Sequence, residues 1–92
     1  MKVHFYATLR AIVQTGTVDV ALREGGSVGE LLDEIVARFP ALRPKLLAGD
    51  GSLARGVHVF VNGRGAGFLP DGLGTPVAPD DSVDIFPAVA GG

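Results

Sequence analysis

The sequence of 92 residues contains no cysteine. Without a thiol the chain has no disulfide, no thiolate zinc site, no iron–sulfur cluster and no cysteine nucleophile, and it suits a reducing compartment. At this length the chain accommodates one small domain, with no room for an enclosed active site of ordinary size. We therefore expect a packed, cytoplasmic protein that is not itself an enzyme.

The sequence also has no basic excess and no long apolar run. Eight Lys and Arg residues stand against ten Asp and Glu, for a formal charge of −2, and they form no basic stripe, so neither nucleic acid nor an anionic membrane is expected as a partner. No segment approaches the roughly 18 apolar residues that indicate a membrane-spanning helix. Its two histidines, His4 and His58, have no neighbouring carboxylate pair, and we expect no metal or other bound cofactor.

The first half of the chain predicts two strands and one helix. Apolar and polar residues alternate over residues 1–8 and again over 17–23, with a loop between, and this pattern predicts an antiparallel hairpin. Ser27 followed by Glu30 is the capping-box pattern of a helix start, and Pro40 disfavours helical geometry in the residue before it. Between these points apolar residues recur at helical spacing: Val28, Leu31, Leu32, Ile35 and Phe39.

The second half is richer in loops. Residues 40–47 predict a short helical turn over the core, and residues 57–61 alternate as a third strand that ends at the reversal signal Asn62-Gly63. Residues 82–88 predict the last strand, and in the glycine-rich stretch before it only residues 68–69 resemble a strand.

This order of elements predicts an α+β fold of the β-grasp, or ubiquitin-like, type: a mixed four- to five-stranded sheet with one main helix packed on one face. A ferredoxin-like sandwich is the alternative, but it needs a second full helix, for which residues 40–47 are too short. We expect one domain over residues 1–87 and a flexible tail over residues 88–92.

The tail ends in Gly91-Gly92. Residues without a Cβ form a thin, permissive backbone that can enter a narrow channel and present the carboxylate of Gly92 to a partner's active site. Six residues from Pro87 span about 20 Å when extended. The alternative is an inert, frayed tail.

A second candidate site lies on the outer face of the predicted sheet. If the valines of residues 57–61 face the helix, the aromatic residues between them face outward. Adjacent outward Phe60 and Phe86 would form an apolar patch of the kind that marks partner sites, unless residues 9–13 or the glycine-rich loop cover one of them. The predicted partner-binding residues are His4, Tyr6, His58, Phe60, Phe86 and Pro87.

Four motifs together resemble one protein family over essentially the whole chain. The motifs are Phe5-Tyr6-Ala7-Thr8-Leu9-Arg10, Ser27-Val28-Gly29-Glu30-Leu31-Leu32, Val61-Asn62-Gly63 and the closing Ile85-Phe86-Pro87-Ala88-Val89-Ala90-Gly91-Gly92. With these motifs the sequence resembles the MoaD/ThiS family of ubiquitin-like sulfur carriers, and its Ala-Val-Ala-Gly-Gly ending is also similar to the CysO-type branch.

The resemblance implies a role for Gly92. A partner enzyme of the MoeB/ThiF type would adenylate the Gly92 carboxylate with ATP, and sulfur would replace AMP to give a thiocarboxylate; Ala90 and Gly91 keep the approach narrow. The acceptor would be a sulfur-accepting synthase. We favour the large subunit of molybdopterin synthase, which would make this chain the small subunit, over cysteine synthase.

Two other functions stay open. An activated Gly92 carboxylate also permits an isopeptide bond to a lysine of a partner protein, as in a ubiquitin-like protein modifier. A function of a different class is a β-grasp interaction module with an inert tail. The sulfur-accepting pathway, the source of the sulfur and the oligomeric state are left open by the sequence.

Overall fold

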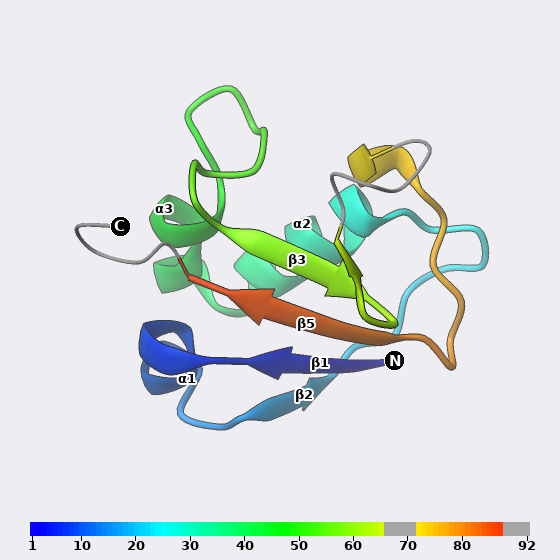
Figure 1. The fold of residues 1–92 in the computed structure, drawn as a ribbon, viewed down its shortest axis with the longest axis horizontal. Helices are drawn as coiled ribbons and strands as arrows, with labels where there is room; N and C mark the ends of the chain where they lie inside the picture. Colours follow the sequence, from blue (N-terminus) through cyan, green and yellow to red (C-terminus); the bar gives the residue numbers. More distant parts are fainter. Residues whose placement is uncertain (66–71, 88–92) are drawn as a thin grey trace.

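The computed structural model describes residues 1–65 and 72–87. Their strands form one five-stranded sheet in the order β2-β1-β5-β3-β4, and Figure 1 shows the helices α2 and α3 behind it. The elements are β1 (Lys2–Phe5), α1 (Ala7–Val13), β2 (Thr17–Asp19), α2 (Val28–Arg38), η1 (Pro40–Leu42), α3 (Arg43–Leu46), β3 (His58–Val61), β4 (Arg64–Gly65), η3 (Gly72–Gly74) and β5 (Ser82–Phe86).

The sheet is mixed because one pair of neighbouring strands in it is parallel. The first strand, β1, pairs in parallel with the last, β5, with Val3 opposite Val83 and Phe5 opposite Ile85. The pairs β1–β2, β3–β5 and β3–β4 are antiparallel. This arrangement confirms the predicted β-grasp fold, including the antiparallel pairing of the first two strands.

One apolar core lies between the sheet and the helices. The inward positions of the strands alternate with outward ones, as the period of two requires, so β5 buries Val83 and Ile85 and leaves the residues between them on the other face. The helix α2 contributes its apolar stripe to the same core. Core side chains with at most 1% of their surface exposed include Val3, Phe5, Leu31, Leu32, Ile35, Val59, Val83 and Ile85.

The predicted ends of the main helix are confirmed. The Ser27 hydroxyl accepts a hydrogen bond from the Glu30 amide at 3.2 Å. The last helical residue is Arg38, and Phe39 caps the helix by donating its amide to the Ile35 carbonyl at 2.8 Å. The Glu30 carboxylate is paired with Arg23. The cap therefore uses the serine half of the capping box, while the glutamate ties the helix to the preceding segment.

The prediction for residues 1–16 was wrong in one respect. The first strand ends at Phe5. A helix, α1, occupies Ala7–Val13, where we expected the end of the strand and then a loop. Leu9 and Val13 are four residues apart, so they share one helix face, and both are buried in the core. The helix ends at Gln14, which adopts a left-handed conformation and donates its amide to the Arg10 carbonyl. The second strand is also shorter than expected, ending at Asp19.

The second half of the chain follows the predictions more closely. η1 and α3 form the helical turn, and their leucines join the core. Asn62 and Gly63 have φ angles of 51° and 84°, the left-handed pair that a tight hairpin requires. This hairpin leads into β4, which the sequence did not predict. The strand-like pair 68–69 lies outside the described residues, and β5 ends at Phe86, two residues before the predicted strand end.

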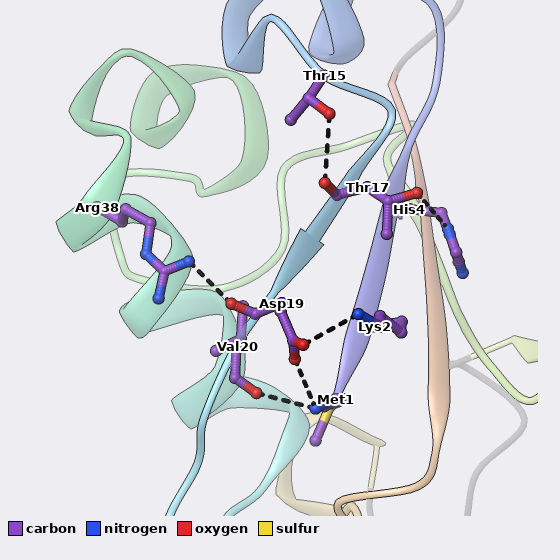
Figure 2. Close-up of polar contacts among 8 residues, drawn as sticks. All are labelled: Met1, Lys2, His4, Thr15, Thr17, Asp19, Val20 and Arg38. Carbon is purple, nitrogen blue, oxygen red and sulfur yellow. Dashed lines mark hydrogen bonds and ion pairs between the residues drawn. The ribbon is translucent and has the colours of Figure 1, made fainter.

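Polar contacts join β1, β2 and α2 at one edge of the molecule (Figure 2). The Asp19 carboxylate accepts hydrogen bonds from Lys2 Nζ at 3.0 Å and from the Met1 α-amino group at 3.2 Å. These contacts, led by the bond from Lys2, lower the pKa of Asp19. From α2, Arg38 donates to the Asp19 carbonyl at 3.0 Å. In residues 1–65 and 72–87 no helix combines the length and apolar character needed to cross a membrane.

Candidate partner-binding face

The pairing register brings the predicted outward residues together in two rows on the face of the sheet opposite the core. In the first row, Asp84 on β5 lies between His4 on β1 and Phe60 on β3. In the second row, Phe86 is paired with His58 on β3 and is stacked against Tyr6, which follows β1.

The aromatic rings of this face contact one another. Tyr6 and Phe86 are stacked, with ring centroids 4.3 Å apart and an angle of 9° between the planes. Phe60 meets Phe86 edge to face at 5.6 Å, and His58 lies 6.4 Å from Phe60 in a tilted arrangement. Both ring geometries are favourable for aromatic pairs. The structure thus confirms that Phe60 and Phe86 are neighbours; we call Tyr6, His58, Phe60 and Phe86 the aromatic face.

The aromatic face remains open to solvent within the described part of the chain. Tyr6 is 38% exposed, and Phe60 and Phe86 are half-buried. Leu9 and Val13 are packed into the core. Residues 66–71 of the glycine-rich loop, the other expected cover, lie outside the described residues.

Tyr6 is tied to β5 by its hydroxyl as well as by its ring. The hydroxyl donates a hydrogen bond to Asp84 Oδ1 at 2.8 Å. This bond, together with the nearby negative charge, raises the pKa of Tyr6, because a phenolate would lose the bond and be repelled by the carboxylate. Asp84 was not among the predicted partner-binding residues. Its signal in the sequence is alternation, which places it two residues before Phe86 on the same face of the last strand.

A shallow groove of about 610 Å³ runs over this face. Apolar and aromatic groups dominate its lining, with one carboxylate among them. The lining residues are His58, Phe60, Gly63, Asp84, Phe86 and Pro87. Four of the six predicted partner-binding residues therefore line one groove, and Tyr6 contacts it through Phe86 and Asp84.

His4 lies apart from the groove. Its Nδ1 is 3.0 Å from the hydroxyl of Thr17 on β2, as Figure 2 shows, and β5 separates it from His58 on β3. Among the described residues no three His, Asp or Glu side chains are grouped so as to hold a metal ion.

The lining of the groove includes the residue at which the chain leaves the sheet. Pro87 follows β5 directly and lines the groove, so the residues beyond it start from the edge of the aromatic face. The predicted reacting segment, Ala90, Gly91 and Gly92, lies outside the described residues.

Comparison with known proteins gives consistent results over nearly the whole chain. Small archaeal modifier protein 1 of Haloferax volcanii is 33% identical over 92 residues, 100% of both chains. The crystal structure of SAMP1 from Haloferax volcanii matches with a TM-score of 0.86 at 32% identity, covering 99% of this chain and 97% of that one.

Two sulfur-related proteins are also similar. Sulfur carrier protein CysO of Mycobacterium tuberculosis is 34% identical over 80 residues, 85% of each chain. The crystal structure of the Amycolatopsis orientalis BexX/CysO complex matches with a TM-score of 0.81 at 29% identity, covering 99% of this chain and 98% of that one. The model of the ThiS family matches residues 3–92. The chain is a member of the ThiS family.

Proposed function

We propose that this chain is a sulfur carrier that acts through the carboxylate of Gly92. The observation that carries the proposal is that the ThiS family match extends to residue 92 and so includes the closing Gly91-Gly92. The similarity to sulfur carrier protein CysO supports the same role.

The chemistry requires two steps on the Gly92 carboxylate. A carboxylate is a poor electrophile, so a carboxylate oxygen first attacks the α-phosphorus of ATP and pyrophosphate leaves, giving an acyl adenylate. Sulfide, supplied through the partner, then attacks the carbonyl carbon, and the C–O bond to AMP breaks, so that the products are a thiocarboxylate and AMP. Dividing one difficult substitution into two easier ones is the logic of covalent catalysis. The catalytic groups and the ATP belong to an activating enzyme of the MoeB/ThiF type, and the small Ala90 and Gly91 admit the tail to its active site.

The aromatic face serves as the docking surface for that enzyme. Contiguous apolar patches on small proteins commonly mark interaction sites, and tyrosine and phenylalanine are enriched in interface cores. Pro87 connects the groove directly to the tail. An enzyme that grips the groove therefore receives the tail from a fixed starting point.

For the acceptor we propose a sulfur-accepting synthase that binds the charged carrier. The large subunit of molybdopterin synthase is the first candidate, from the resemblance of the sequence to the MoaD/ThiS family. Cysteine synthase is supported equally, because CysO is among the relatives.

Protein modification is a second candidate function. The relative from Haloferax volcanii is named a modifier protein and is similar over 100% of both chains. If a lysine amine instead attacks the carbonyl carbon of the same acyl adenylate, an isopeptide bond forms and AMP leaves. High-mass conjugates that disappear when Gly92 is deleted would indicate this function.

Intact-mass spectrometry tests the sulfur-carrier proposal. The chain is incubated with ATP, sulfide and the MoeB/ThiF-type enzyme of its own organism. We expect the mass change of one oxygen-to-sulfur exchange, located by fragmentation at Gly92, and no change when ATP is omitted. If neither adenylate nor thiocarboxylate forms with an enzyme preparation that is active on ATP, the chain is better described as an interaction module with an inert tail.

A further inference from the structure

One carboxylate lies within an otherwise apolar and aromatic groove. Asp84 is the acidic member of the lining, with Phe60 as its direct cross-strand neighbour and Phe86 two residues along β5. Its Oδ1 accepts the hydrogen bond from Tyr6. Among the described residues no other hydrogen bond to the Asp84 side chain is found, so its Oδ2 faces solvent or a partner.

Among the described residues no cation forms an ion pair with Asp84. The ion pairs of the described part join Asp19 to Lys2 and to the Met1 amino group, and Glu30 to Arg23. Lys2 shares the outer face of β1 with His4, but its ammonium group pairs with Asp19 on β2, on the side of β1 away from β5. Residues 66–71 and 88–92 contain no Lys, Arg or His. The negative charge in the groove is therefore available to a partner.

This arrangement restricts what can cover the groove. A purely apolar partner surface would remove water from the carboxylate without replacing its lost interactions, and burying an unpaired charge is costly. A guanidinium group suits this site, because it forms a charge-assisted hydrogen bond to a carboxylate oxygen and also stacks on aromatic rings. Phe60, opposite Asp84 on β3, and Phe86, two residues along β5, provide those rings.

We propose that the groove binds a partner segment carrying an arginine side chain, which pairs with Asp84 and packs on Phe60 and Phe86. This proposal rests on the proposed function: the arginine belongs to the activating enzyme, and Asp84 determines which enzyme binds. Tyr6 is a positioning residue: its hydroxyl holds Oδ1 and leaves the other oxygen for the arginine.

The experiment measures binding of the chain to the MoeB/ThiF-type enzyme of its organism by calorimetry without ATP, at low and high salt and at slightly alkaline pH. Asp84→Asn keeps the shape of the side chain and removes its charge. We expect its Kd to be about 10-fold or more above that of the unaltered chain at low salt. We also expect the salt dependence of binding to be smaller for the variant, since salt screens charge pairs.

Asp33→Asn is the matched control. It makes the same change of charge at an exposed position of α2, on the other side of the sheet, and should bind as the unaltered chain does. Tyr6→Phe keeps the stacked ring and removes the hydroxyl, and should show part of the Asp84→Asn defect. Amide NMR spectra of the variants verify that the fold is unchanged.

The outcomes separate this inference from the proposed function. If Asp84→Asn binds as tightly as the unaltered chain, with the same salt dependence, the arginine pairing is wrong even if thiocarboxylate forms normally. If the charge effect appears but Gly92 is not adenylated when ATP is added, the proposed function is wrong and the pairing stands. If the unaltered chain does not bind, or if a second copy of the chain occupies the groove in solution, the pairing is overturned.

Discussion

At the scale of single residues, a few polar side chains determine where the chain turns. Asn62 occupies the first position of the hairpin between β3 and β4, and its side chain also fixes the start of β5. The Asn62 carboxamide donates to Asp81 at 2.9 Å and accepts from the Ser82 amide at 2.9 Å. This one residue therefore joins the hairpin to the strand that leads into the aromatic face and the tail.

The neighbouring Gly63 is required for its backbone conformation. Its φ is +84°, and a Cβ at this position would meet no atom within 4 Å, so a substitution costs backbone strain alone. We expect Gly63→Ala to lower the free energy of unfolding by about 1 kcal/mol, measured by urea denaturation. Gly49 is the matched control: it is equally uncrowded, and its φ lies outside the left-handed region, so Gly49→Ala should be neutral or stabilising. Equal effects of the two variants would contradict this account of the hairpin.

The lowered pKa of Asp19 predicts a pH dependence of stability. A carboxyl whose pKa is lower in the folded state than in the unfolded chain stabilises the fold above its ordinary pKa, which is 3.8 here, and this contribution is lost as the pH falls through and below that value. Thermal denaturation of Asp19→Asn should therefore show a lower melting temperature than the unaltered chain at neutral pH.

In acid the difference between the two proteins should disappear, because the protonated Asp19 no longer binds Lys2 and the Met1 amino group as an anion. High salt should also reduce it, since the contacts are exposed. A difference that stays constant from neutral to acidic pH would mean that the charge of Asp19 is not the cause.

At the scale of secondary-structure elements, the sequence predicted those whose signals are local and failed where packing decides. The Ser27 cap and Pro40 mark the ends of α2, and strict alternation marks β3 and β5. The helix α1 has no side-chain cap, and its first residue, Ala7, has φ +51°. Its two core contacts, Leu9 and Val13, are too few to distinguish a helix from a loop.

Other errors at this scale have the same origin. β4 comprises two residues whose strand state depends on pairing with β3, and nothing in its composition indicates that pairing. The site shows a similar division. Alternation predicted the outward aromatic residues, whereas the Tyr6–Asp84 hydrogen bond joins residues 78 positions apart in the chain and depends on the parallel pairing of β1 with β5.

The packing of α1 gives a prediction at this scale. Leu9 is fully buried, so Leu9→Ala should remove about 2–5 kcal/mol from the free energy of unfolding through lost apolar burial and the cavity left behind. Thr8→Ala, at an exposed position of the same helix, should change it by less than about 0.5 kcal/mol. Chemical denaturation of both variants checks this, and a small effect of Leu9→Ala would show that α1 is not part of the core.

At the scale of the whole molecule, the proposed docking face and the residue from which the proposed reacting tail begins lie at the same end of β5. The sheet displays the aromatic face with the Asp84 carboxylate in it, and the chain leaves that face at Pro87 toward Gly92. No side chain of the folded part has to perform chemistry in the proposed mechanism. In this proposal docking and reaction belong to different parts of the chain, so a substitution can change one of them without changing the other.

Removal of Gly91 and Gly92 tests this division most directly. The shortened chain should give the amide NMR spectrum of the intact fold over residues 1–87 and should still bind the activating enzyme, with some loss of affinity from the missing tail contacts. In a sulfur-transfer assay with that enzyme, ATP, sulfide and the acceptor synthase, the account predicts that the intact chain delivers sulfur and the shortened chain delivers none. Sulfur delivery by the folded, shortened chain at the rate of the intact one would contradict it.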